Sequence, residues 1–187
     1  MKKTAGALIF ALSTPLMALE IGVKVGSANV IWKDGDYTPL DLYASVYLES
    51  LSDMTPVFKA GPSVEILYGR KSLGIFDCWD YGLCRLDFTV TGFELNAKAA
   101  VTPVPMFDVF GGAGVSYGRF GLDASDFYTG NPVGTLGDEY GTGFQAFGGA
   151  QANFGVFGVG MEYKRKWVNT ESVNGISSYT LNLSLKF

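Results

Sequence analysis

The feature of this sequence that most constrains its fold is an alternation of apolar and polar residues with a period of two. Successive side chains of a β-strand point to opposite faces, so this period predicts strands. The final ten residues, SYTLNLSLKF, alternate without exception. Eight segments show the pattern: 20–26, 40–49, 63–69, 86–99, 107–118, 144–153, 157–164 and 178–187. The sequence therefore predicts an all-β protein.

The first 18 residues have the organisation of a secretory signal peptide. Lys2 and Lys3 precede a charge-free, mostly apolar stretch, and Ala18 is a small residue suited to the position before cleavage. The stretch meets Glu20 before it reaches the ~20 apolar residues of a membrane helix. We expect a signal peptide over 1–18 and one domain over 19–187. Cleavage removes two lysines, so the formal charge of −4 becomes −6, which argues against a nucleic-acid partner.

The composition is apolar, but its distribution does not suit membrane helices. Charged residues make up 17% of the chain, against a usual ~25%, and aromatic residues 14%. The longest charge-free stretch of the mature chain, 140–161, contains seven glycines and would form a poor helix. Two fold classes remain: a secreted soluble all-β domain, or a membrane β-barrel.

The connections between the predicted strands favour the barrel. Those after the second, fourth and sixth segments are short, whereas the others are mostly longer: 33–38, 71–85, 121–142 and 168–175. Short turns on one side and long loops on the other are typical of outer-membrane barrels. Aromatic residues also fall near both strand ends, as at the two membrane interfaces. We place Trp32, Tyr68, Tyr117, Tyr163 and Trp167 on the long-loop side, and Phe58, Phe107, Phe154 and Phe187 on the short-turn side.

These observations predict an eight-stranded antiparallel up-and-down transmembrane β-barrel whose apolar row faces lipid. One segment changes phase, and we expect a bulge near Gly92 that leaves Phe88 and Val90 on the lipid face. Pro62 lacks a ladder donor, so we expect it at a bulge or beyond the lipid core. The predicted inward charges are Glu20, Lys24, Asp41, Glu49, Glu65, Asp87, Asp108, Glu162, Lys164, Lys166 and Lys186. Eight strands leave little bore, which favours a closed network of paired charges over an ion or proton path.

The second long loop contains the only two cysteines. Cys78 and Cys84 belong to an exported chain, where an oxidising compartment favours a disulfide over two free thiols. A metal site is disfavoured, because the chain has no histidine and no second cysteine pair. Trp79 and Tyr81 on the same loop are possible contacts for a partner, although a place in the aromatic girdle is the simpler interpretation.

The signal peptide, the alternating strands, the long loops and the terminal phenylalanine resemble the small outer-membrane β-barrels of Gram-negative bacteria. These include the OmpA-like, OmpX-like and OmpW-like groups. The resemblance implies an outer-membrane location among lipids, a monomer, and a last strand that the barrel-assembly machinery reads. The residues that match this assembly signal are Tyr179, Leu181, Leu183, Leu185 and Phe187.

The resemblance is weak for activity. Enzymes among the small outer-membrane barrels use a histidine, and this chain has none, so we predict no enzymatic activity and no cofactor. The expected role is structural, or an interaction of the surface loops with an extracellular ligand. A narrow channel for small hydrophobic solutes or ions, and an adhesin acting through its loops, are the alternatives.

Deleting Phe187 should impair membrane insertion more than it destabilises the folded barrel, because the resemblance makes this residue part of the assembly signal. Insertion would be measured as the amount of heat-modifiable protein recovered from outer membranes. Stability would be measured by urea unfolding of the purified barrel. An equal loss in both measurements would contradict the prediction.

Overall fold

The computed structural model describes residues 18–77 and 82–187. These residues form nine strands: β1 (Ala18–Trp32), β2 (Tyr37–Pro39), β3 (Leu42–Thr55), β4 (Phe58–Asp77), β5 (Leu83–Val104), β6 (Phe107–Asp126), β7 (Pro132–Phe154), β8 (Phe157–Asn169) and β9 (Val173–Lys186). Nowhere in these two ranges is there a helix long and apolar enough to cross a membrane.

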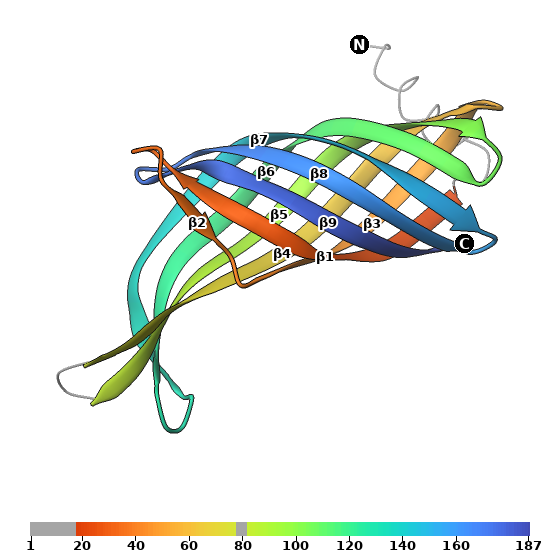
Figure 1. Ribbon diagram of the computed structural model, residues 1–187. Coiled ribbons are helices and arrows are strands. Elements are labelled where there is room, and N and C mark those ends of the chain that lie inside the picture. The colour runs from red at the N-terminus through yellow and green to blue at the C-terminus, as the bar shows by residue number, and fades with distance from the viewer. Residues whose placement is uncertain (1–17, 78–81) are drawn as a thin grey trace, which may run out of the picture.

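Eight of the strands close into a ring, as predicted (Figure 1). In the ring, β1 pairs with β3, and each strand from β3 to β8 pairs antiparallel with the next strand in the chain. β9 returns to pair with β1. The closing register runs from Glu20↔Lys186 to Trp32↔Val173. The short strand β2 belongs to the first long loop and pairs only with the end of β1. Closure leaves the ring without a free edge within the barrel, which a lipid-embedded sheet requires.

The connections at one end of the ring are tight. β7 and β8 are joined by a two-residue turn between Phe154 and Phe157, in which Gly155 has a φ of 63°. Glycine adopts positive φ without steric cost, and two-residue hairpins with glycine first are common for this reason. The C-terminus and the described start of β1 lie at this same end (Figure 1).

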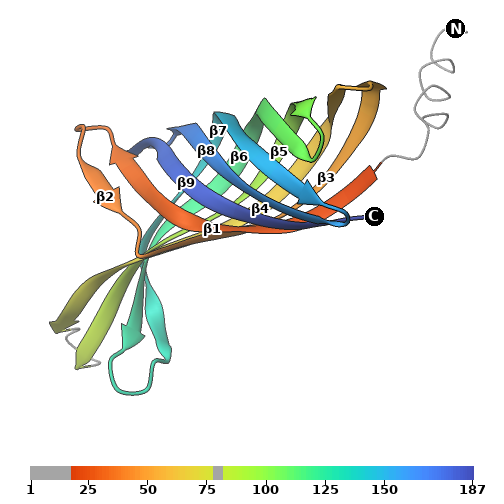
Figure 2. The same ribbon diagram turned by 45° about the vertical axis from the view of Figure 1, so that its right-hand side comes forward.

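The strands differ in length, which makes the other end asymmetric. β4, β5, β6 and β7 have 20, 22, 20 and 23 residues, whereas β1, β3, β8 and β9 have 13 to 15. β4 continues past its last β3 partner at Arg70, and β7 begins ahead of its first β8 partner at Thr142. The excess forms a four-stranded extension that projects from the barrel (Figure 2). We call this extension the wing: residues 71–77, 83–88, 121–126 and 132–141.

The bulge predicted near Gly92 is absent. Gly92 pairs with Leu67 on one side and Gly118 on the other, in registers that continue unbroken through this part of β5. Phe88 and Val90 therefore face the interior, where they are buried, and do not face lipid. The prediction was wrong because it assigned every apolar residue of this strand to the outside.

Pro62 is not at a bulge either. It faces outward and pairs in register with Ala97 of β5. On its other side the β3–β4 pairs pass from Glu49↔Ser63 to Ser52↔Ala60 without a shift. The barrel therefore accommodates the missing donor by a local gap in the ladder and not by an extra residue.

The outer surface carries the predicted apolar belt with aromatic residues at both ends. Tyr117 and Trp167 are 55% and 45% exposed near the long loops, and Phe154 and Phe187 are 56% and 76% exposed near the short turns. Rings on neighbouring strands are stacked in the pairs Tyr117–Tyr140 and Phe144–Trp167 and tilted in the pair Tyr163–Tyr179. Trp32 is the exception, because it packs against residues inside the mouth of the barrel.

Candidate functional site

The middle of the barrel interior is occupied by paired charges. Three lysines and three glutamates form this central cluster: Lys24, Lys164, Lys166, Glu65, Glu94 and Glu162. Lys24 Nζ lies 2.7 Å from a carboxylate oxygen of Glu65 and 2.9 Å from Glu162. Lys164 Nζ lies 2.8 Å from Glu65 and 2.7 Å from Glu94. All six side chains are almost completely buried, so each charge depends on its partners for solvation.

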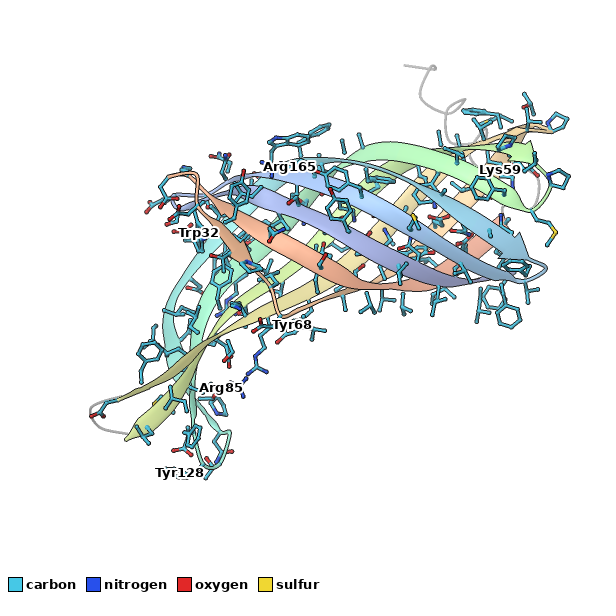
Figure 3. All side chains as sticks on the ribbon, in the orientation of Figure 1. Trp32, Lys59, Tyr68, Arg85, Tyr128 and Arg165 are labelled. Carbon is cyan, nitrogen blue, oxygen red and sulfur yellow. The ribbon has the colours of Figure 1, made fainter. Side chains whose placement is uncertain are left out.

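A second set of pairs fills the short-turn end of the interior. Lys98 Nζ donates to both carboxylate oxygens of Glu49 at 2.8 Å, and it lies 4.1 Å from the centre of the Phe110 ring. Lys186 lies 3.3 Å from Glu20. A cavity of about 150 Å³ opens between these residues at the end of the barrel where Lys59 is seen in Figure 3. Its lining mixes both charge signs, which gives no preference for either kind of ion.

Most of the predicted inward charges are in these clusters, with two corrections. Asp41 lies outside the barrel on the first long loop, where it accepts a hydrogen bond from Lys71 at 2.8 Å. Asp87 lies on the face of β5 opposite the interior, beside Arg70 and Arg85, because the expected bulge is absent.

Two interior charges were missed, although the sequence contained a signal for them. Phe93, Leu95 and Ala97 alternate along β5 as an outward apolar row, and this places Glu94 and Lys98 on the inward face. Both are buried and ion-paired. The signal is masked by Phe88 and Val90, which are apolar although they lie on the same inward face of β5.

The interior becomes apolar toward the long loops. Ten buried residues make up this mouth cluster: Ala28, Val30, Leu40, Tyr43, Leu67, Phe88, Val90, Phe120, Val173 and Ile176. Trp32 and Val168 pack against it from the loop side. Together with the charged clusters, these side chains occupy most of the narrow interior, apart from the small cavity at the short-turn end.

Above the mouth cluster lies a cavity of about 550 Å³, which we call the mouth cavity. Trp32, Phe88, Phe120 and Val173 provide apolar lining at its base, and Leu73 and Leu122 extend this lining onto the wing. The Trp32 and Phe88 rings are 5.3 Å apart, and the indole N–H of Trp32 donates to Thr38 at 2.8 Å. The indole polar group is thus satisfied, which leaves the ring as apolar surface.

Carboxylates stand at the rim of the mouth cavity. Glu139 accepts hydrogen bonds from the hydroxyl and the backbone N–H of Ser172, and these bonds lower the pKa of Glu139 below its usual value. Asp138 is held by the guanidinium of Arg119, 3.1 Å away. Glu171 also lines the rim and is exposed to solvent.

The predicted loop site falls largely outside the described residues. Cys78, Trp79 and Tyr81 lie there, whereas Cys84 is buried in β5. The disulfide and the loop contacts stay predictions. The described residues contain no group of histidine, cysteine or acidic side chains able to hold a metal. The proposed assembly row faces outward, with exposures of 62% for Tyr179, 65% for Leu181, 56% for Leu183, 40% for Leu185 and 76% for Phe187.

Comparison with known proteins identifies the fold. No protein-family model matches the chain, and no curated protein matches its sequence. Its structure is similar to Ail, the attachment invasion locus protein of Yersinia pestis, with a TM-score of 0.60 and 13% identity over 92% of this chain and 100% of that one. Neisserial surface protein A gives a TM-score of 0.65 and 11% identity over 91% and 99%. A structure of Ail in complex with the heparin analogue sucrose octasulfate gives 0.57 and 14% over 90% and 99%.

The fold and the apolar outer surface are those of the small outer-membrane β-barrel proteins. Identities this low establish a common fold and leave the activity open. In proteins of this fold the short turns are periplasmic and the long loops extracellular. The wing and the mouth cavity lie at the long-loop end of the barrel, which is the extracellular end under that rule.

Breaking the Lys98–Glu49 pair should be costly, whereas removing both charges should not. Glu49→Leu or Lys98→Met alone leaves a buried charge without its partner and should cost about 3–5 kcal/mol of stability. The double variant should lie within about 1 kcal/mol of the parent, because two apolar side chains of similar size need no solvation. Urea unfolding of the four proteins in micelles measures the cycle. Additive losses in the double variant would disprove the coupling.

Proposed function

We propose that this protein is a non-enzymatic protein of the outer membrane that contacts a macromolecular partner outside the cell through its wing. The observation that carries the proposal is the unequal length of the strands. Four adjacent strands continue beyond the barrel while the others end at its mouth. A membrane-spanning ring needs no such extension, so the extra strand length serves the space outside the membrane.

The surface of the wing supports this role. Ile75, Phe76 and Leu136 are 52%, 46% and 62% exposed on it, and Tyr128 at the adjoining hairpin tip is 78% exposed (Figure 3). Apolar and aromatic side chains at an exposed tip are typical of protein-contact surfaces.

The likeness to Ail, an attachment protein, agrees with an interaction role, but the heparin analogue is a poor guide to the ligand here. Six acidic residues lie on the described part of the wing, Asp77, Asp87, Asp123, Asp126, Asp138 and Glu139. They stand against Lys71 and Arg85 on the wing and Arg70 and Arg119 at its base, which leaves a net charge of −2. A polyanion would meet repulsion on this surface. We therefore expect a protein partner with an apolar or basic contact surface.

The filled interior argues against transport, and this has a direct test. The purified protein in a planar bilayer should show no steady open-channel current under conditions in which a general porin conducts, because paired charges and the mouth cluster occupy the bore. Sustained ohmic conductance, or uptake of a hydrophobic probe into proteoliposomes, would contradict the proposal and favour the channel.

Removing exposed apolar side chains from the wing should reduce attachment. Bacteria that display the variant Ile75→Ser/Tyr128→Ser/Leu136→Ser should bind cultured cells and matrix proteins several-fold less than bacteria that display the parent. The matched control, Met54→Ser/Val57→Ser/Val156→Ser, removes side chains of similar exposure from the periplasmic turns and should bind normally. Surface amounts are equalised by cell-surface labelling. Equal attachment by parent and wing variant would overturn the proposal.

A further inference from the structure

The mouth cavity has the properties of a small-molecule site. Its volume of about 550 Å³ falls within the ~300–1,000 Å³ of ligand pockets. Side chains from seven of the strands and from the β8–β9 connection line it, so the cavity exists only in the assembled mouth. Phe88, Phe120 and Val173 are themselves buried and fixed by the mouth cluster, which makes the apolar base a rigid surface. The wing contact proposed above makes no use of this surface.

The charge around the cavity has one sign. Three carboxylates line it, Asp138, Glu139 and Glu171, and no lysine or arginine does. Asp138 is ion-paired on the outer face of the wing with Arg119, which also binds Asp123. Glu139 pairs in register with the inward-facing Phe120, so its side chain lies on the cavity side of the sheet. Glu171 makes no hydrogen bond or ion pair with any residue in the described part of the chain.

One lysine lies near enough to attract these carboxylates and so compete with a cationic ligand. The charge of Lys33, on the first long loop, acts on Glu139, but Lys33 is exposed and is not part of the lining. Glu139 and Glu171 therefore lie above the aromatic floor of the cavity, and no lysine or arginine of the described residues is ion-paired with them. Such a combination complements a molecule that is apolar at one end and positively charged at the other.

We propose that the mouth cavity binds small amphipathic ammonium compounds. The apolar body lies on Trp32, Phe88 and Phe120, and the ammonium group lies at the rim between Glu139 and Glu171. A neutral analogue keeps the apolar contact and loses the charge attraction, whereas an anionic analogue is repelled by both carboxylates. This activity goes beyond the proposed wing contact and does not depend on it.

Three probes of one shape test the charge preference: 4-phenylbutylammonium, 4-phenylbutanol and 4-phenylbutyrate. Binding to the full-length protein in zwitterionic nanodiscs is measured by titration calorimetry, with empty nanodiscs as the blank for membrane partition. We expect saturable binding in the order ammonium, alcohol, carboxylate. The ammonium should also lose affinity as salt is added, because exposed charges are screened. No saturable binding above the blank, or equal binding of ammonium and carboxylate, would overturn the proposal.

Substitutions of the rim carboxylates test whether the ammonium group binds at the rim. Glu171→Gln removes only the charge of a side chain that has no partner among the described residues, so the cavity persists, and it should weaken ammonium binding about threefold. Glu139→Gln/Glu171→Gln should weaken it about tenfold and leave the alcohol unchanged. Lys33→Gln should strengthen ammonium binding, and Asp77→Asn, an exposed carboxylate outside the lining, should have no effect. Unchanged ammonium affinity in Glu171→Gln and in the double variant would disprove the site.

The same titration separates this site from the wing contact. The wing variant Ile75→Ser/Tyr128→Ser/Leu136→Ser alters no residue of the cavity lining and should bind the ammonium probe as the parent does. Loss of attachment with normal ammonium binding supports both proposals. Normal attachment with ammonium binding that responds to Glu171→Gln would refute the wing proposal alone.

Discussion

The absence of water in the hydrocarbon core of a membrane is the constraint on which this structure depends. Every backbone N–H and C=O there must find a partner within the protein. Pairing of β1 with β9 meets this need by joining the two ends of the sheet, from Glu20↔Lys186 to Trp32↔Val173. Once the ring is closed, the period of two sorts side chains between lipid and interior, and an apolar exterior follows.

Closure also creates an interior that must be filled. The pairs of the central cluster cross this interior: Lys24 of β1 contacts Glu65 of β4 and Glu162 of β8, neither of which is on a strand adjacent in the ring. The ion pairs thus link strands that share no backbone hydrogen bonds. Toward the extracellular side the charges give way to the mouth cluster, so the interior ends in an apolar surface beneath the loops.

The sequence was sufficient for the barrel, the strand number and the lipid face, because these depend on a period that each strand repeats. It was less informative where that period conflicts with hydrophobicity. Phe88 and Val90 are apolar yet face the interior, and only the contacts made by other strands, such as Leu67 and Phe120, show why. The mouth cavity was not predicted, since its lining comes from residues far apart in the sequence and only the closed ring brings them together.

The wing is a continuation of barrel strands and not a set of loops attached to them. β5 and β6 pair from Cys84↔Asp126 in the wing to Val104↔Phe107 at the periplasmic turn. A partner bound near the tip, as we propose, would therefore be held on a stiff support, and the wing would lose little conformational freedom on binding. A force along the strands also loads many ladder hydrogen bonds together. Tension applied at the tip of the wing is therefore carried along these strands into the ring.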